Sequence, residues 1–406
     1  MKILLVNWIY GQGSTGIICK DLLSHFKKEG HDVIVATWIN KTSDVEVKSV
    51  TKRWYNFIYW RLLKIGWPKY AAGSRSNIQL EKLIKDFNPD VVNLHVINNG
   101  FLNLYRLLSY LAKNKIKTVV THHAEYYYTG SCGYSYKCDD WFQNQCKSCL
   151  MPNKVTGACV GGNPHRMWKL MKRSFDNFSN ENLLFTAVSP WVTQRSIKSP
   201  IVNRFQCFTI LNGVDTSIYY RRIVTREFLN KIENLNSKIA LHVTAKFDSF
   251  DRNNIKGGYY LVELAKRMNN VTFIVVATDC IINNSLPSNI YVWGRSESRE
   301  ELANLYSISD VTVLTSYKET FSMICAESTC CGTPVVGFYA GGPETICIPE
   351  FCTFVDHGDV ELLCRELNNT LLKTFDKNKI SQMAIMKYSK EKMANSYLRV
   401  YKKIID

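Results

Sequence analysis

The segment YKETFSMICAESTCCGTPVVGFYAGGPETI, from Tyr317 to Ile346, shows the order of elements that predicts the fold. The apolar run Val311–Leu314 before it predicts a buried strand, and Phe321–Cys331 within it predicts a helix. Gly332 ends that helix, and another apolar strand is predicted over Pro334–Phe338. A strand, a helix and a second strand in this order are typical of a parallel sheet covered by helices.

The same alternation extends outward over both halves of the chain. It predicts an α/β fold with two doubly wound, Rossmann-like domains, and a boundary between Ile201 and Asn236. Residues 125–164, rich in Cys, Tyr and Gly, interrupt the pattern and predict a long functional insertion. The further strands are predicted at Lys2–Trp8, Asp32–Trp38, Val91–His95, Thr118–His122, Leu183–Val188, Ile239–Ala245, Val271–Ala277 and Ile290–Trp293. The further helices are predicted at Ile17–Glu29, Gln79–Phe87, Leu102–Asn114, Arg166–Phe178, Gly258–Met268 and Arg299–Ile308.

Composition narrows the class of protein. The chain has 406 residues, is 46% hydrophobic and contains no run of 18 apolar residues, which argues against a membrane span. The short apolar run after Lys2 is interpreted as a first strand rather than a signal peptide. The net charge of +16 favours an anionic substrate, an anionic membrane surface or nucleic acid as partner, but no nucleic-acid-binding motif is present.

Three glycines follow the first predicted strand. Gly11, Gly13 and Gly16 match the G-x-G-x-x-G pattern of dinucleotide-binding turns. That pattern also needs an acidic residue after the second strand, where Thr37–Asn40 contains none, so an NAD-dependent oxidoreductase is the weaker alternative. The glycines remain compatible with a tight turn or with close approach to a ligand, above all at Gly13.

One glutamate precedes the helix predicted from Phe321, and a second lies within it. With Thr320, Phe321 and Ser322 as its first turn, free amides and the helix dipole would favour a phosphate there. A carboxylate at Glu319 could hold sugar hydroxyls, and one at Glu327 could hold a ribose. By the spacing alone, a capping acid and a solvated helix residue are the simpler explanation.

The surrounding motifs resemble the donor site of family 4 glycosyltransferases, which have the GT-B fold. The resemblance rests on Ser316–Ser322 with Ala326-Glu327, Gly332–Val336 and Gly341–Glu344. It extends to an inter-domain turn at Asn212–Asp215, a diphosphate lysine at Lys256-Gly257 and a histidine loop at Thr121–Cys132, similar to that of capsule, O-antigen and colanic-acid-type members.

The resemblance implies a retaining hexosyltransferase whose two domains face a central cleft. Glu319 and His123 would be catalytic and would contact the transferred sugar, while Lys256 would bind the diphosphate with help from Lys246 or Arg252. The donor-binding residues implied are Gly13, Asn212, Gly213, Lys246, Arg252, Lys256, Trp293, Gly294, Arg295, Thr320, Phe321, Ser322 and Glu327. Beside His123 the family often has Asp, here Ala124, and Glu125 could take that role.

The residues also indicate catalysis without a metal ion. No spaced D-x-D motif is present, because Asp139 and Asp140 are adjacent. Cationic side chains and helix amides would then stabilise the leaving diphosphate in place of Mg²⁺. No cofactor is expected for catalysis, and no clear carboxylate nucleophile is seen on the acceptor side.

The insertion contains a separate candidate metal site. Cys132, Cys138, Cys146 and Cys149 could close a tetrahedral structural zinc site, the last two with C-x-x-C spacing. Free thiols or a redox disulfide are the alternatives.

Basic and aromatic residues gather between Arg53 and Tyr70. Interleaved Trp, Tyr, Arg and Lys suit a lipid interface, although a cover helix packed on the sheet explains them too. The chain is therefore expected to be cytoplasmic, with possible peripheral attachment to the inner face of the plasma membrane.

Together these features predict sugar transfer from a UDP- or GDP-sugar to a polyprenyl-diphosphate-linked saccharide during bacterial surface polysaccharide synthesis. The acceptor-binding domain is expected at 1–205, the donor-binding domain at 206–385, and a helix crossing back to the first domain at 386–406. A non-catalytic sugar- or nucleic-acid-binding protein is the other alternative, and it predicts no turnover.

Overall fold

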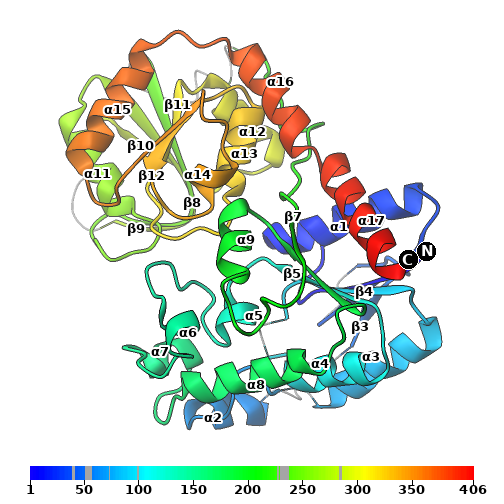
Figure 1. Ribbon diagram of the computed structural model, residues 1–406. Coiled ribbons are helices and arrows are strands. Elements are labelled where there is room, and N and C mark those ends of the chain that lie inside the picture. Colours follow the sequence, from blue (N-terminus) through cyan, green and yellow to red (C-terminus); the bar gives the residue numbers. More distant parts are fainter. Residues whose placement is uncertain are drawn as a thin grey trace. The chain divides into compact units, whose positions relative to one another are not determined.

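The computed structural model describes residues 1–38, 42–50, 57–72, 74–97, 100–225, 228, 237–282 and 286–406. The chain forms two compact units (Figure 1). Unit 1 comprises Met1–Leu211 and Met393–Asp406, and unit 2 comprises Asn212–Lys392. The division falls after Leu211, six residues beyond the predicted end of the first domain at residue 205. The last residues of the chain, from Met393, belong to unit 1.

Unit 1 contains a parallel sheet in the order β3-β2-β1-β4-β5-β6-β7, with helices on both faces (Figure 1). The strand order reverses between β1 and β4, which is the point where ligands bind in doubly wound sheets. The strands are β1 (Lys2–Val6), β2 (Asp32–Thr37), β3 (Val47–Ser49), β4 (Val91–Leu94), β5 (Thr118–His122), β6 (Leu183–Ala187) and β7 (Cys207–Thr209). The helices are α1 (Gly13–Lys28), α2 (Phe57–Lys64), α3 (Ser74–Phe87), α4 (Leu104–Lys113), α5 (Tyr126–Thr129), α6 (Asp140–Gln143), α7 (Pro152–Thr156), α8 (Pro164–Asp176), α9 (Pro190–Ser196) and, at the end of the chain, α17 (Lys390–Ile405).

Unit 2 repeats this design with the strand order β10-β9-β8-β11-β12-β13 and a reversal between β8 and β11. The strands are β8 (Lys238–Asp248), β9 (Val271–Ile281), β10 (Ile290–Gly294), β11 (Val311–Leu314), β12 (Val335–Phe338) and β13 (Cys352–Val355). The helices are α11 (Gly258–Arg267), α12 (Arg299–Ile308), α13 (Met323–Cys330), α14 (Pro343–Ile346), α15 (Val360–Leu372) and α16 (Lys377–Tyr388).

Burial on both faces explains why the strands read as continuous apolar runs. All residues of β4, β5, β6, β11 and β12 are buried, as expected for parallel strands between two helical layers. In unit 1, Tyr397 and Tyr401 of α17 pack in the same core as β1 and α1. Asn93 donates a hydrogen bond to the Tyr401 hydroxyl at 2.6 Å, which satisfies a buried amide.

Several predicted boundaries change. The helix predicted from Phe321 begins only at Met323, because Ser322 has a φ of 84° that no helix residue adopts. Strands β8 and β9 extend to Asp248 and Ile281, beyond the predicted ends, because they pair in parallel along their whole length. The short strands β3, β7 and β13 were not predicted.

The predicted insertion is not one irregular loop. It carries the short helices α5, α6 and α7 and runs into α8, whose N-cap Asn163 accepts a hydrogen bond from Arg166 N. Of the basic aromatic stretch Arg53–Tyr70, the structure shows α2 over Phe57–Lys64, and residues 51–56 lie outside the described residues. In the part of the chain that is described, no helix is long and apolar enough to span a membrane.

Candidate functional site

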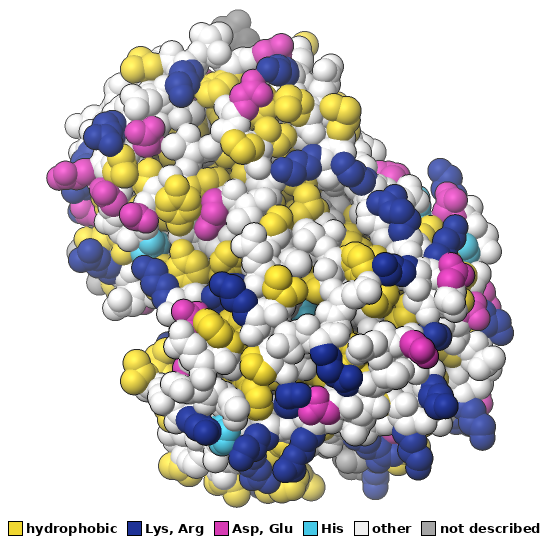
Figure 2. All heavy atoms as spheres, viewed as in Figure 1, with side chains coloured by type: hydrophobic (Ala, Val, Ile, Leu, Met, Phe, Trp, Pro, Cys, Tyr) yellow, Lys and Arg dark blue, Asp and Glu magenta, His cyan; other side chains and the backbone are white. Residues whose placement is uncertain are grey.

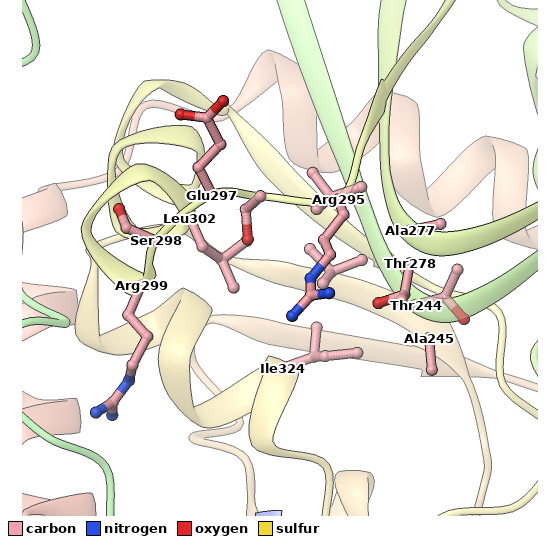
Figure 3. A pocket seen from close by; sticks show the side chains of 13 residues that line it. Thr244, Ala245, Ala277, Thr278, Arg295, Glu297, Ser298, Arg299, Leu302 and Ile324 are labelled. Atoms are coloured by element: carbon pink, nitrogen blue, oxygen red, sulfur yellow. The ribbon is translucent and has the colours of Figure 1, made fainter. Parts of the chain in front are cut away.

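A cavity of about 460 Å³ lies in unit 2 at the carboxyl ends of the strands β8 and β9 (Figure 3). Thr244 and Ala245 of β8 and Ala277 and Thr278 of β9 form one side. The segment from Arg295 to Arg299, which follows β10 and opens α12, forms another, and Ile324 from the first turn of α13 completes it. The cavity therefore adjoins the strand-order reversal beside β8 and lies near the N-terminal ends of two helices, where an anion is stabilised.

Arg295 is the cation that points into this cavity. Figure 3 shows its guanidinium directed toward Ile324 and Thr244, whereas the side chains of Glu297 and Arg299 point away. Gly294 just before it has a φ of 82°, which suits glycine and turns the chain from β10 toward α12. The predicted donor-site residues Gly294 and Arg295 thus lie at or beside the cavity, while Trp293 packs against Phe228 with ring centroids 5.5 Å apart.

Lys256 and Glu319 form an ion pair, with Nζ 2.7 Å from Oε1. The side chains are only 31% and 16% exposed, so each charge is partly shielded from water. Gly257 after the lysine has a φ of 69°, and a Cβ there would lie 2.2 Å from the Thr315 carbonyl oxygen. Glycine is therefore required to bring Lys256 against the segment that carries Glu319.

Backbone bonds to the double glycine hold Glu319 in place. Glu319 N donates to Ala340 O, and Gly342 N donates to Glu319 O, at 3.0 and 2.8 Å. A Cβ on Gly342 would lie 2.4 Å from the Thr320 carbonyl, so no larger residue fits. Thr320, Phe321 and Ser322 precede α13 instead of forming its first turn, and the Ser322 hydroxyl caps the helix by accepting from Cys325 N at 3.4 Å.

Glu327 lies inside α13 and accepts a hydrogen bond from the Tyr306 hydroxyl at 3.3 Å. Burial raises the pKa of its carboxyl to about 7, and the positive charge of Arg299 and the Tyr306 hydroxyl oppose that rise. Arg299 is also 3.8 Å from Asp215, which pairs with Lys390 at 2.9 Å. A half-buried carboxylate in such surroundings is suited to accepting hydrogen bonds from ligand hydroxyls.

Lys246 and Arg252 are the two alternatives for a second diphosphate ligand. Lys246 lies within β8, in register with Asp279, and not in the loop after the strand as predicted. Arg252 is exposed beside Tyr260. Neither lines the cavity, and Lys256 does not line it either, so a diphosphate role for Lys246 or Arg252 stays a prediction. Arg299, which was not predicted as a donor residue, does line the cavity. The sequence feature that could have identified Arg299 is the capping pattern of Ser298 and Glu301, which marks the start of α12.

Asn212 and Gly213 open unit 2, directly after the division of the chain. Asn212 is only 6% exposed, and its Oδ1 is buried with no hydrogen-bond partner in the structure. A buried acceptor of this kind calls for a donor from outside the described protein.

In unit 1 the glycine turn follows β1 and opens α1. Gly11 and Gly13 have φ values of 68° and 62°, and a Cβ on either would meet nothing within 4 Å, so the turn leaves open space at Gly13. Gly11 N donates to Gly16 O at 2.9 Å, which closes the turn. The glycines thus serve turn geometry at the N-terminus of α1.

His123 lies at the end of β5 and pairs with a second histidine. His95 Nδ1 and His123 Nε2 are 2.9 Å apart, with His95 placed just after β4. Burial lowers the pKa of His123 to about 4, so the neutral ring is the form that acts at neutral pH. His95 was not predicted, and its only sequence signal is its place at the end of an apolar strand.

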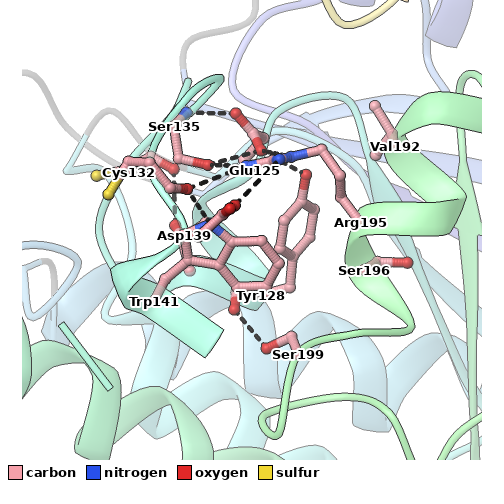
Figure 4. A network of polar contacts seen from close by, with 12 residues as sticks. Glu125, Tyr128, Cys132, Ser135, Asp139, Trp141, Val192, Arg195, Ser196 and Ser199 are labelled. Atoms are coloured by element: carbon pink, nitrogen blue, oxygen red, sulfur yellow. Dashed lines mark hydrogen bonds and ion pairs between the residues drawn. The ribbon is translucent and has the colours of Figure 1, made fainter. Parts of the chain in front are cut away.

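Glu125 does not pair with His123. Figure 4 shows its carboxylate converging with Arg195, Tyr128 and Ser135, and Arg195 Nε lies 2.8 Å from Glu125 Oε1. Glu125 is fully buried, so its charge requires this arginine. The guanidinium also stacks over Trp141 and Trp191, at 5.1 and 4.9 Å. These contacts of Arg195 hold the insertion against α9, so we interpret Glu125 as a structural residue.

The four cysteines of the predicted zinc site are free thiols here. Cys146 is buried and donates to Thr129 O at 3.6 Å, Cys138 is exposed, and Cys132 and Cys149 are half-buried. Burial raises the pKa of Cys132 to about 12, so it is protonated at neutral pH. Within the described ranges, no three His, Cys, Asp or Glu side chains are arranged to hold a metal ion. The thiols of Cys138 and Cys149 nevertheless lie close enough to help raise the pKa values of Cys132 and Cys146, so the zinc site stays a prediction.

Two family models match the two units. The model described as Glycosyltransferase Family 4 matches residues 15–218. The model described as Glycosyl transferases group 1 matches residues 277–391.

Individual proteins are similar to this chain over different lengths. A D-inositol 3-phosphate glycosyltransferase of Mycolicibacterium smegmatis is 44% identical over 46 residues, which are 11% of this chain and 11% of that relative. A sucrose-phosphate synthase from Thermosynechococcus elongatus has a TM-score of 0.68 at 15% identity, covering 99% of this chain and 98% of the other. The Anabaena protein HepE in complex with UDP has a TM-score of 0.67 at 13% identity, covering 99% and 100%. Both structures have the same fold as this chain.

Proposed function

The chain belongs to glycosyltransferase family 4 and has the GT-B fold, and on that basis we propose that it moves a hexosyl group from a UDP- or GDP-sugar to a lipid-linked saccharide. The observation that carries the proposal is the Lys256–Glu319 ion pair in the same unit as the Arg295-lined cavity. The family match favours this function over an oxidoreductase or a non-catalytic binding protein.

The donor's chemistry matches the residues of unit 2. A nucleoside diphosphate needs cations and helix N-termini for its phosphates, and Lys256, Arg295 and the first amides of α13 supply both. The two hydroxyls of a ribose need a group with two hydrogen-bond-accepting oxygens. We assign that role to the carboxylate of Glu327. HepE, a structural neighbour, binds UDP, which supports a nucleotide donor.

Departure of the diphosphate is the step that the protein must assist. Negative charge grows on the leaving oxygen as the glycosidic bond to phosphate breaks, and Lys256 is the cation placed to offset it. Glu319 then orients the hydroxyls of the transferred sugar. We propose retention of anomeric configuration and no metal requirement, because cations and amides supply the stabilisation that a metal would otherwise give.

The acceptor side is assigned to unit 1. Neutral His123, held by His95, can accept or donate one hydrogen bond to a sugar hydroxyl. We propose that the acceptor is a polyprenyl-diphosphate-linked saccharide of a bacterial surface polysaccharide such as a capsule or O-antigen. The enzyme would then work at the cytoplasmic face of the plasma membrane as a peripheral protein.

A panel of nucleotide sugars tests the donor assignment. Thermal unfolding and donor hydrolysis are measured for the wild type and for Glu319→Ala, in buffer with and without EDTA. We expect one UDP- or GDP-sugar to raise the unfolding midpoint, and Glu319→Ala to bind it with little hydrolysis. Stabilisation by none of the donors would refute the proposal, and loss of hydrolysis in EDTA would refute metal independence.

A further inference from the structure

Unit 1 exposes a group of large apolar side chains that the proposed chemistry does not use. They come from α2 with the turn after it and from the segment between α6 and α8 of the insertion. Their exposed fractions are Ile58 70%, Trp60 46%, Ile65 68%, Trp67 46%, Leu150 95%, Met151 52% and Val160 61%. Contiguous apolar side chains in water are unfavourable and mark interaction sites.

The two segments are joined into one surface. The Lys64 carbonyl accepts hydrogen bonds from Cys159 N and Val160 N at 2.8 and 3.2 Å. A Cβ on Gly66 would lie 2.5 Å from the Gly161 carbonyl oxygen, so the two backbones touch there. Residues 57–67 and 150–161 are called the docking face below.

The opposite side of α2 anchors the docking face to the protein. Tyr59 and Leu63 are 7% and 4% exposed and form a small core with Ala72. Lys69 Nζ reaches across to the Val155 carbonyl at 3.0 Å. Ile58 and Trp60 therefore stay exposed because the buried positions of the helix are already filled, and the face is held in one shape.

The charge around the docking face is mainly positive. Residues 57–72 contain three Lys or Arg and residues 142–175 contain six, and neither range contains Asp or Glu. Figure 2 shows dark blue Lys and Arg side chains beside yellow hydrophobic ones where Figure 1 shows α2, α7 and α8. Of these cations, Lys172 pairs with Asp176 at 2.5 Å, and Lys69 Nζ donates to the Val155 carbonyl at 3.0 Å.

We propose that the docking face binds an anionic lipid bilayer. Its apolar side chains would enter the boundary between headgroups and acyl chains, where Trp60 and Trp67 are well suited, and its cations would lie at the phosphates. An excess of cations around exposed apolar tips matches this partner better than a protein surface, whose rim would carry both signs in balance. This deepens the proposed function by naming the surface that meets a membrane-borne acceptor.

Vesicle flotation with the full-length protein tests the proposal. The protein is mixed with vesicles of phosphatidylcholine alone or with phosphatidylglycerol added. We expect it to float with the anionic vesicles, and the double variant Leu150→Asn/Met151→Asn to lower the partition coefficient roughly tenfold, because binding scales with buried apolar area. Arg61→Gln/Lys154→Gln should lower it by about fivefold per charge on anionic vesicles and hardly at all on neutral ones.

A matched control substitutes an exposed leucine elsewhere. Leu372 in unit 2 is 84% exposed, and Leu372→Asn should float as the wild type does. The proposal is overturned if the wild type stays in the supernatant, if Leu372→Asn lowers flotation equally, or if Leu150→Asn/Met151→Asn instead abolishes a dimer seen by light scattering. Nucleotide-sugar stabilisation is measured on each variant, because its loss in the wild type would refute the donor assignment and leave the membrane result standing.

Discussion

The carboxyl of Glu327 makes the stability of the protein depend on pH in a direction that can be measured. Its pKa is raised from 4.5 to about 7 in the folded protein, mainly by burial. The groups that interact with it are Arg299, Tyr306, Tyr219, Cys330 and Cys331, and only Arg299 carries a charge at neutral pH. A raised carboxyl pKa means that the folded state binds the proton more tightly than the unfolded chain does.

The sign and size follow from that shift. Below about pH 4.5 the carboxyl is protonated in both states and does not lower the free energy of unfolding. Above about pH 7 the folded state must hold a half-buried carboxylate. The wild-type free energy of unfolding therefore loses about 3 kcal/mol as pH rises through this window, at about 1.4 kcal/mol per pKa unit. Glu327→Gln has no carboxyl proton to lose, so its free energy of unfolding does not fall in this way.

Thermal unfolding of wild type and Glu327→Gln from about pH 5 to about pH 8 measures the effect. The midpoint of the variant minus that of the wild type should rise by roughly 5–10 °C with pH, at about 2–4 °C per kcal/mol for a domain of this size. Taking the difference cancels other titrating groups such as His123. Glu361→Gln, on the exposed start of α15, controls for the loss of one negative charge. A midpoint difference that stays constant across the pH range would show that the carboxyl is not perturbed by burial.

Other substitutions test the remaining contacts. Lys256→Met should weaken nucleotide-sugar binding by roughly 2–3 kcal/mol because a charge-assisted phosphate contact is lost, as measured by calorimetry; an unchanged affinity would remove this lysine from the diphosphate site. Arg195→Met should destabilise unit 1 by about 3–5 kcal/mol in urea unfolding because Glu125 is left buried and unpaired, and adding Glu125→Gln should recover part of this; no recovery would argue against the charge as the cause. Gly342→Ala should abolish donor turnover because its Cβ would lie 2.4 Å from backbone, whereas Gly133→Ala, with nothing within 4 Å, should leave turnover intact; equal activity of the two would contradict the packing argument.

Local sequence patterns were sufficient to predict the two doubly wound units. Runs such as Thr118–His122 and Val311–Leu314 appear as strands with the predicted ends, because a strand buried on both faces must be apolar throughout. Short strands were missed for the opposite reason. Cys207–Thr209 and Cys352–Val355 are half-buried strands at or near the ends of their sheets, and their composition does not differ from that of a loop.

In the donor segment, local sequence patterns predicted the important residues but not the ends of the elements. The motif from Tyr317 predicted which residues would matter, but the helix begins only at Met323 because Ser322 takes a positive φ, and the preceding Glu319 bonds to Ala340 and Gly342. The sequence placed Lys246 after a strand, yet β8 runs on past it because β9 pairs with it that far. Both errors come from hydrogen bonds to residues distant in sequence.

The sequence by itself therefore determined the α/β class, the order of elements and the identity of Glu319, Glu327 and Lys256 as candidates. Periodicity, glycine positions and residue chemistry are local properties that survive in any environment. Only the tertiary structure decided the partners: Glu319 with Lys256, His123 with His95 instead of Glu125, and Glu125 with Arg195. Pairing depends on which strand ends and helix starts meet, and burial then sets the pKa values that the chemistry needs.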